Sequence, residues 1–238
     1  MTSDAAVLLD VDGTLVDSND AHARAWVEAF AEHGITVAFD HVRRSIGMGG
    51  DKLMPEVAGI EESSDLGEKI GARRGEIFAT RYLPHLQPFP QVRELLERLT
   101  ADGFVLVVAS SAKEDELDPL LERAGVADLI TRTTSSDDAE NSKPDPDIVV
   151  AAVKKAGCPK DRTIMIGDTP YDVAAARRAG IDIVGLECGG WTGASLAGAL
   201  AVYRDAAELL ARYERSVFAA ALLKQPAMVD GKWKMEKT

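Results

Sequence analysis

The sequence predicts an α/β fold, in which a Rossmann-like, doubly wound parallel sheet forms the core and an α-helical domain is inserted into it. Short apolar runs alternate with longer stretches of helical periodicity, which is typical of such sheets. Several of these runs end in a polar residue, where strands of this fold carry their ligand sites. Residues 18–85 interrupt the alternation with helical segments and contain no convincing strand.

Four short runs are predicted to be strands of the core. They are Ala5–Leu9, Phe104–Val108, Thr163–Ile166 and Asp182–Leu186. Each is largely apolar throughout rather than alternating, which is typical of parallel strands covered by helices on both faces. Leu129–Thr131 is a weaker candidate for a fifth strand.

Helices are expected between and after these strands. The predicted segments are Pro90–Ala101, Asp145–Gly157, Pro170–Ala179 and a late amphipathic stretch, Asp205–Leu223. Proline near the start and glycine at or just past the end mark the first three of them. Ligands in doubly wound sheets bind beyond the carboxyl ends of the strands. Asp10, Ser110 and Asp168 each follow a predicted strand, so the site is expected there.

The helical block after the first strand is predicted to be a second domain. Its first segment, Asn19–His33, carries Ala23, Trp26 and Phe30 on one face and is followed by Gly34. Because the block separates the first strand from the others, it is expected to be an insertion. The predicted organisation is a core of residues 1–17 and 86–238 and a helical domain of residues 18–85.

Composition excludes several classes of function. The net charge of −12 argues against a nucleic-acid partner, which needs a basic face, and against an anionic membrane surface. A small phosphorylated ligand remains compatible, because the local field of a site can oppose the net charge. The apolar runs are much shorter than the roughly 20 residues of a membrane helix. The two cysteines, Cys158 and Cys188, suit reduced thiols, so a cytoplasmic location is expected; the oligomeric state is left open.

The string Asp10–Ser18 carries the strongest chemical signal. Asp10 and Asp12 follow a buried strand, and a buried charge is costly unless a cation or strong donors compensate for it. A Mg²⁺ ion would meet that cost. Gly13 allows a tight turn directly after the acids. The alternative for an isolated pair of this kind is a turn with solvated carboxylates.

The complete string resembles the first motif of the haloacid dehalogenase (HAD) superfamily, and the rest of the chain fits the other three motifs. The second motif is an apolar strand ending in a hydroxyl residue, as at Ser110. The third is a lysine before a helix, as at Lys143-Pro144. The fourth is an acidic pair after a strand, as at Asp168 and Asp172. The motifs occur in the family's order, and the resemblance covers roughly residues 5 to 187.

The resemblance implies a role for each of these residues. Asp10 is the expected nucleophile, and Asp12 the acid that protonates the leaving oxygen and then activates water. Ser110 is expected to bind the phosphoryl group and Lys143 to offset its charge. Mg²⁺ is the implied cofactor, held by the Asp10 and Asp168 carboxylates and the Asp12 backbone carbonyl. For Asp172, support of the metal, pairing with Lys143 and capping of the next helix remain open.

An acid at position 12 points to phosphate esters, because the family's dehalogenases and phosphonate-cleaving members lack it. The inserted helices resemble the cap of the phosphoglycolate phosphatase and β-phosphoglucomutase branch. The expected substrate is therefore a small phosphorylated metabolite, either phosphoglycolate or a sugar phosphate. The candidate substrate-binding residues are Gly13, Thr14, His22, Arg44, Gly49 and Ser111. Arg43 and Arg44 suit a second phosphate or a carboxylate, but they equally suit a basic helix surface, as do Arg73 and Arg74.

Two readings compete within this branch. The segment from Asp17 to Trp26, which includes His22, is similar to the entry into the mutase cap. The mutase, however, has an adjacent Glu-Asp pair in its fourth motif, whereas Gly167 precedes Asp168 here. A hydrolase is therefore the preferred interpretation and a β-phosphoglucomutase-like isomerase the alternative. A phosphotransferase with another acceptor also remains open, and the intact acids argue against a catalytically inactive binding protein.

Overall fold

A parallel sheet forms the centre of the molecule. In the computed structural model, which describes residues 5–223, 228–229 and 232–233, five parallel strands lie in the order β2-β1-β3-β4-β5. Their bounds are β1 Ala6–Leu9, β2 Val105–Val108, β3 Thr163–Gly167, β4 Asp182–Leu186 and β5 Ala201–Tyr203. The chain order reverses between β1 and β3, and in doubly wound sheets the crevice at that point holds the ligand.

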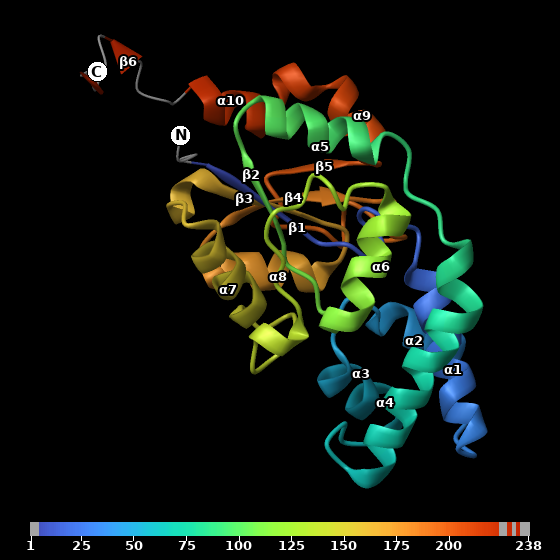
Figure 1. Cartoon of the computed structure of the whole chain (residues 1–238). Coiled ribbons are helices and arrows are strands. Elements are labelled where there is room, and N and C mark those ends of the chain that lie inside the picture. Colours follow the sequence, from blue (N-terminus) through green and yellow to red (C-terminus); the bar gives the residue numbers. More distant parts are fainter. Residues whose placement is uncertain (1–4, 224–227, 230–231, 234–238) are drawn as a thin grey trace.

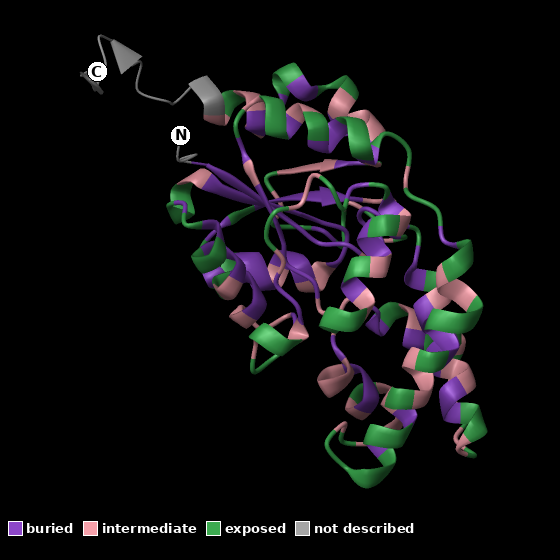
Figure 2. Cartoon of the chain, viewed as in Figure 1, coloured by how far each residue is buried: buried purple, intermediate pink, exposed green. Residues whose placement is uncertain are grey.

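Helices cover both faces of the sheet (Figure 1). One face packs against α5 (Val92–Ala101), α6 (Glu114–Ala124), α9 (Ala206–Ala211) and α10 (Val217–Leu223). The other packs against α7 (Asp147–Ala156) and α8 (Pro170–Ala179). Alternate residues of each strand point to opposite faces, so Val7 and Leu9 join the first core and Ala6 and Leu8 the second. Figure 2 shows the central strands buried, which explains why their sequences are almost wholly apolar.

The helical insertion, residues 19–85, leaves the sheet after β1 and returns before α5. It contains α1 (Asn19–Glu32), α2 (Phe39–Ser45), α3 (Gly50–Ala58), α4 (Asp65–Ile77), a π-helical turn (Phe78–Tyr82) and a 3-10 turn (Leu83–His85). The helices pack around a small core that includes Trp26, Phe30, Leu53 and Ile70. Figure 1 shows the insertion beside one end of the sheet.

Shorter elements complete the chain. Three 3-10 turns cover Ser136–Asp138, Lys160–Arg162 and Tyr213–Arg215. The strands β6 (Met228–Val229) and β7 (Lys232–Trp233) form a separate antiparallel pair. Within the described ranges, no helix is both long enough and apolar enough to cross a membrane.

Two sequence-based predictions about elements were wrong. Leu129–Thr131 is not a strand; the chain makes only an isolated parallel bridge to β2, at Arg132. The fifth strand is instead β5, an edge strand so short that the sequence gives little signal for it. The late helix is also interrupted, because a 3-10 turn at Tyr213–Arg215 separates α9 from α10.

Candidate active site

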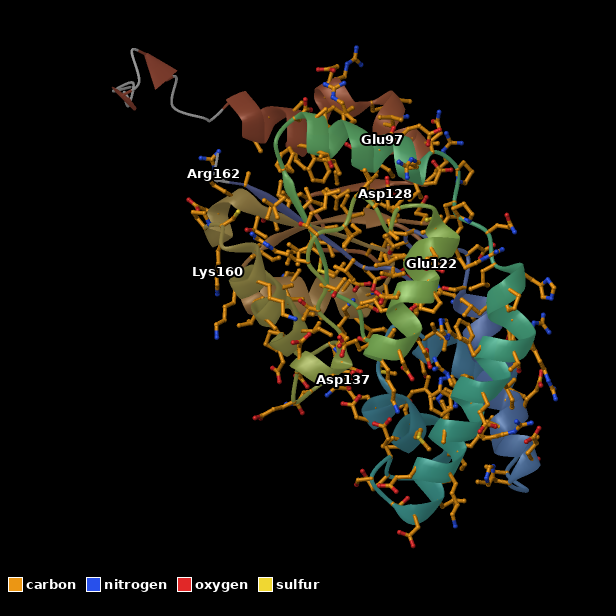
Figure 3. The ribbon with its side chains drawn as sticks, viewed as in Figure 1. Glu97, Glu122, Asp128, Asp137, Lys160 and Arg162 are labelled. Atoms are coloured by element: carbon orange, nitrogen blue, oxygen red, sulfur yellow. The ribbon has the colours of Figure 1, made fainter. Side chains whose placement is uncertain are left out.

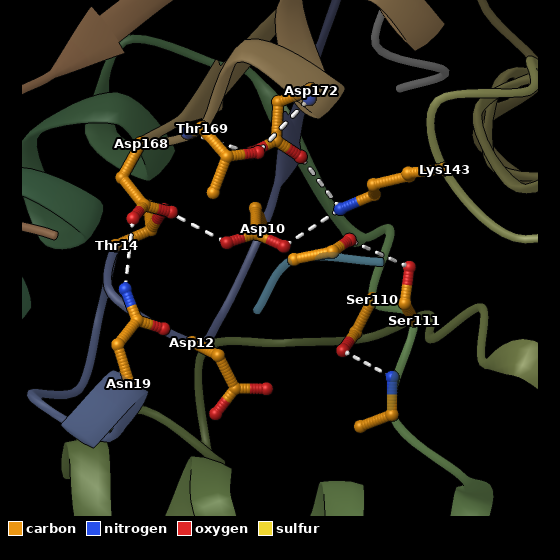
Figure 4. Close-up of polar contacts among 12 residues, drawn as sticks. Asp10, Asp12, Thr14, Asn19, Ser110, Ser111, Lys143, Asp168, Thr169 and Asp172 are labelled. Atoms are coloured by element: carbon orange, nitrogen blue, oxygen red, sulfur yellow. Dashed lines mark hydrogen bonds and ion pairs between the residues drawn. The ribbon is translucent and has the colours of Figure 1, made fainter. Parts of the chain in front are cut away.

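Three neighbouring strands end at the candidate site. Asp10 follows β1, Ser110 lies two residues beyond β2, and Asp168 follows β3. All three residues are buried. Because the strands are parallel and adjacent, their carboxyl ends meet at one edge, and residues separated by more than a hundred positions converge there (Figure 4).

Lys143 is the cation of this cluster. Its side chain is fully buried, and Nζ lies 2.7 Å from Asp10 Oδ1 and 2.8 Å from Asp172 Oδ1. Burial by itself would lower the pKa of Lys143, but the attraction of Asp10 and Asp172 outweighs it and raises this pKa. The lysine therefore stays charged and compensates for part of the negative charge around it.

The carboxylates outnumber the lysine. Burial, together with repulsion from Asp172 and Asp12, raises the pKa of Asp10 to about 7, although Lys143 opposes the change. Burial and the repulsion of Asp10 and Asp172 also raise the pKa of Asp168 well above its usual value. Such uncompensated charge is costly in the interior and marks a place where a further cation would be stabilising.

A divalent cation fits this place. Asp10, Asp168 and Asp172 each offer a carboxylate oxygen, and these oxygens lie within 4.8 Å of one another. The buried Asn19 Oδ1 has no hydrogen-bond partner among the described residues, while Asn19 Nδ2 donates to Asp168 Oδ2 over 3.0 Å. Hard oxygen ligands of this type suit Mg²⁺. The side chain of Asp12 is not part of the carboxylate cluster.

Asp172 combines two of its three expected roles. It lies in the first turn of α8, where it forms a capping box with Thr169: Asp172 Oδ2 accepts from the Thr169 backbone nitrogen, and Thr169 Oγ1 accepts from the Asp172 nitrogen. Its other oxygen pairs with Lys143. The cap fixes the orientation of Asp172 and thereby the position of the lysine.

Asp12 lies in a different environment from Asp10. Its Oδ1 lies 2.7 Å from His22 Nε2 and 2.5 Å from the Ser18 hydroxyl. His22 Nδ1 faces Arg74 Nη2 at 2.8 Å, and a guanidinium can only donate, so Nδ1 accepts and Nε2 donates to Asp12. Burial would raise the pKa of Asp12, but His22, Ser18 and Arg74 together lower it. The insertion thus holds Asp12 as a carboxylate.

The turn after β1 and the end of β2 place the smaller polar groups. Thr14 Oγ1 lies 2.9 Å from Asp10 Oδ2 and 3.2 Å from Asp168 Oδ1. Gly13 has φ +79°, and a Cβ there would overlap Asn19 and Asp168. Ser110 Oγ accepts from the Ala112 nitrogen over 3.0 Å, and the Ser111 hydroxyl donates to the Gly47 carbonyl over 3.4 Å.

Two adjoining cavities lie between the insertion and the sheet. A small one of about 50 Å³ is lined by Asp10, Asp12, His22 and Ser110. A larger one of about 740 Å³ is lined by Gly49 and many further residues. The two share lining residues, which are Trp26, Met48, Arg74, Ser111 and Ala112.

Arg44 is not brought to these cavities. Its Nε donates to the Asp40 carbonyl on the surface of α2. The neighbouring Arg43 turns to the core and donates to the Gly189 carbonyl. Arg74 is the arginine that reaches the site, where it contacts His22 and pairs with Glu116. The sequence-based choice of Arg44 rested on residue type alone, whereas the packing of α2 and α4 decides which arginine faces inward.

Asn19 and Glu116 were missed altogether. Asn19 opens a helix, where asparagine is common for local reasons, so its contact with Asp168 has no sequence signal. Glu116 is one of several acids in the first turn of α6. Only the packing of α4 against α6 distinguishes it.

Comparisons with known proteins agree with this geometry. A family model of haloacid dehalogenase-like hydrolases matches residues 7–186. The chain is 32% identical over 214 residues to a phosphoglycolate phosphatase of Rhodospirillum rubrum, covering 86% of this chain and 88% of that one. It is 33% identical over 187 residues to Protein SUPPRESSOR OF QUENCHING 1, chloroplastic, of Arabidopsis thaliana, but spans only 18% of that protein.

A solved structure, that of a hydrolase from Pseudomonas syringae, shares the fold with a TM-score of 0.82 at 32% identity, over 89% of this chain and 98% of that one. The family match covers most of the chain and includes the strands that carry Asp10, Ser110 and Asp168. The chain belongs to the haloacid dehalogenase-like hydrolases.

Proposed function

We propose that the protein is a Mg²⁺-dependent phosphomonoester hydrolase that acts on a small phosphorylated metabolite through an aspartyl-phosphate. The observation that carries this proposal is the contrast between two carboxyls on one turn. Asp10 is aligned by Lys143 and Thr14 beside a crowded acidic cluster. Asp12, two residues on, is held by His22 and Ser18. Two carboxyls in different environments suit a nucleophile and an acid–base group.

The first half of the reaction transfers the phosphoryl group to the protein. A carboxylate oxygen of Asp10 attacks phosphorus, and the bond between phosphorus and the leaving oxygen breaks. Asp12 takes up the proton of the monoanionic ester as the ester binds and gives this proton to that oxygen, and the alcohol departs. Lys143 and the hydroxyl of Ser110 offset the charge on the phosphoryl oxygens.

The second half releases phosphate. Asp12, now a carboxylate, takes a proton from water as the water oxygen attacks phosphorus, and the bond to Asp10 breaks. The donors around Asp12 favour this basic form, because His22 directs its Nε2 proton at Oδ1. Inorganic phosphate takes that proton from Asp12 as it leaves, and Asp10 and Asp12 are carboxylates again.

The carboxylates of Asp10 and Asp168 and the backbone carbonyl of Asp12 would hold Mg²⁺, with Asp172 supporting the site. When bound, the ion neutralises charge on the transferring phosphoryl group. Asn19 orients Asp168, since its Nδ2 donates to Oδ2, and the Thr14 hydroxyl, which has a single proton, lies between Asp168 Oδ1 and Asp10 Oδ2. The excess of buried negative charge supports the assignment of a cation to this place.

Residues 18–85 form the proposed cap domain over a core of residues 1–17 and 86–238. Ser111, His22 and Gly49 line the cavities between them, whereas Gly13 and Thr14 lie in the turn after Asp12. All five are the proposed substrate-side residues. The proposed substrate-side arginine is Arg74 and not Arg44, because only Arg74 lines these two cavities. The named phosphoglycolate phosphatase relatives support phosphoglycolate or a sugar phosphate as the class to test first.

One observation favours the mutase alternative. His22, on the insertion, directly contacts Asp12, so the position of the insertion is coupled to the acid–base group. An isomerase needs such coupling to keep water out while it exchanges phosphoryl groups. Conversion of β-glucose 1-phosphate to glucose 6-phosphate, followed with a coupled dehydrogenase, separates this activity from release of phosphate.

The test of the proposed function is hydrolysis of p-nitrophenyl phosphate. We expect release that requires Mg²⁺, stops with EDTA and falls at least about a thousandfold in Asp10→Asn, which removes the nucleophile. Asp161→Asn is a matched control, because Asp161 lies in a 3-10 turn outside both cavities. Metal-independent release, or full activity in Asp10→Asn, would overturn the proposal.

A further inference from the structure

The larger cavity, which adjoins the small one beside Asp10, is lined by many more acidic than basic side chains. Its lining contains two basic residues, Arg74 and Lys113, and seven acidic ones. The acids are Asp51, Glu62, Glu76, Asp115, Glu116, Asp137 and Glu140. Figure 3 shows Asp137 on the side of the core that faces the insertion, while Lys160 and Arg162 lie on the opposite side.

The basic residues do not balance these acids. Arg74 is already engaged, because it pairs with Glu116 and donates to His22 Nδ1. Its guanidinium also packs over two aromatic rings, with Cζ 5.3 Å from the ring centroid of Trp26 and 5.4 Å from that of Phe78. Lys113 is exposed at the rim, where solvent screens its charge. A second anionic group on a substrate would find no free buried cation here within the described part of the chain.

Glu62 is an acid of this cavity that is partly buried and lacks an ion-pair partner among the described residues. It lies in the loop between α3 and α4, half-buried, and no hydrogen bond or ion pair engages its carboxylate among the described residues. The loop is held close to α3, because a Cβ added at Gly50 would come within 2.5 Å of Glu62 Oε1. Burial and the nearby Asp51 raise the pKa of Glu62, although Lys113 and Arg74 oppose this.

We propose that Glu62 is a specificity-determining residue, which selects phosphomonoesters with a neutral or positively charged leaving group and rejects those that carry a second acid. The inference rests on the proposed hydrolase function, because it assigns the larger cavity to the leaving group. Of the two substrate classes proposed above, it favours a sugar phosphate over phosphoglycolate, whose leaving group carries a carboxylate. A carboxylate without a partner accepts hydrogen bonds from hydroxyl or ammonium groups and repels carboxylates and phosphates. The repulsion acts through a partly desolvated space, which strengthens it.

The test compares three substrates of one shape. They are phenyl phosphates that carry a carboxylate, a hydroxymethyl or an aminomethyl group in the para position. We expect wild-type kcat/KM, measured as release of inorganic phosphate, to be lowest for the carboxylate. In Glu62→Gln, the ratio of carboxylate to aminomethyl kcat/KM should rise about tenfold, because one repulsive charge is removed. Differences in leaving-group reactivity cancel when the variant is compared with the wild type.

The controls separate failure of this inference from failure of the proposed function. Glu61→Gln removes a neighbouring exposed acid outside the cavity and should leave all three ratios unchanged. If p-nitrophenyl phosphate and all three phenyl phosphates resist hydrolysis in Mg²⁺, the proposed function fails. If they are hydrolysed but the wild type prefers the carboxylate, or the Glu62→Gln ratio equals the wild-type ratio, the selectivity inference is overturned.

Discussion

Lys143 shows how one buried side chain organises the whole acidic cluster. It is fully buried, and its ammonium lies between Asp10 and Asp172, which come from different elements. A buried ion pair gains little over an apolar pair of the same shape, but removing one partner leaves an uncompensated charge. Loss of the lysine is therefore expected to affect both the stability of the protein and the proposed activity.

Lys143→Met is expected to lower the free energy of unfolding by about 3–5 kcal/mol without metal, because two buried carboxylates lose their cation. Hydrolysis should be lost as well. The measurement is urea denaturation in EDTA. Lys155→Met is the control, since Lys155 forms a partly exposed pair with Asp138 and should cost about 1 kcal/mol or less. Equal losses in the two variants would contradict the account of Lys143.

Glu62→Gln is expected to stabilise the protein in a pH-dependent manner. The folded-state pKa of Glu62 is raised above its ordinary 4.5, so the folded state holds this proton more tightly than the unfolded state. Protonated Glu62 therefore contributes to the stability of the wild type below about pH 4.5, and this contribution is lost as the pH rises through the folded-state pKa. The Tm of the variant should exceed that of the wild type at pH 7.5, and the difference should vanish near pH 4. A difference that grows on acidification would contradict this assignment.

At the scale of elements, the turn between β1 and α1 joins the catalytic strand to the insertion. Within a few residues it supplies Asp10, Asp12, Thr14, Asn19 and His22. The chain reverses so tightly that Gly13 lies against Asn19 and Asp168, with positive φ. Because glycine has no side chain, residue 13 avoids both a steric overlap with Asn19 and Asp168 and the cost of a positive φ. A single methyl group at this position would introduce both costs.

Gly13→Ala is expected to destabilise the protein more than Gly34→Ala. Both glycines have positive φ, which costs a non-glycine residue about 1–2 kcal/mol. A Cβ at Gly34 meets nothing within 4 Å, whereas at Gly13 it overlaps Asn19 and Asp168. The free energies of unfolding of both variants are measured with denaturant, and the difference between their losses gives the cost of the steric overlap at Gly13. Similar losses of stability would show that the turn relaxes without cost.

At the scale of the whole molecule, the site exists only where the sheet and the insertion meet. The sheet contributes Asp10, Ser110 and Asp168, and the insertion contributes His22 and Arg74. Further contacts hold the two parts together at the rim, including Lys52 Nζ to Asp145 Oδ2 at 2.5 Å and the Tyr171 hydroxyl to the Arg44 carbonyl at 2.7 Å. Binding at this junction should therefore be visible in the stability of the entire chain.

Mg²⁺ is expected to raise the Tm of the wild-type protein. A cation that binds only the folded carboxylate cluster stabilises it by about 2.7 kcal/mol at a hundred times its Kd. Asp168→Asn should abolish most of the shift, while Asp182→Asn, at the exposed start of β4, should keep it. The measurement is calorimetry with and without Mg²⁺, and it does not depend on turnover. A full shift in Asp168→Asn would place the ion elsewhere.

The local pattern of the sequence determined the α/β class, four of the five sheet strands and the acids at their ends. These features depend on neighbouring residues, because a strand buried on both faces must be apolar and a charge at its end is conspicuous. The sequence did not predict the short edge strand β5 or the break before α10, because short segments at the periphery carry weak periodicity.

Tertiary structure alone decided which polar residues share a cavity. The sequence-based choice among Arg43, Arg44, Arg73 and Arg74 fell on Arg44, whereas helix packing turned Arg74 toward His22. In the sequence, Glu62 is one of five acids between positions 56 and 68, whereas packing of the loop after α3 placed it in the cavity. The physical reason is that covalent spacing fixes which residues share a helix face or a strand end, while contacts between distant elements depend on how their apolar faces pack together.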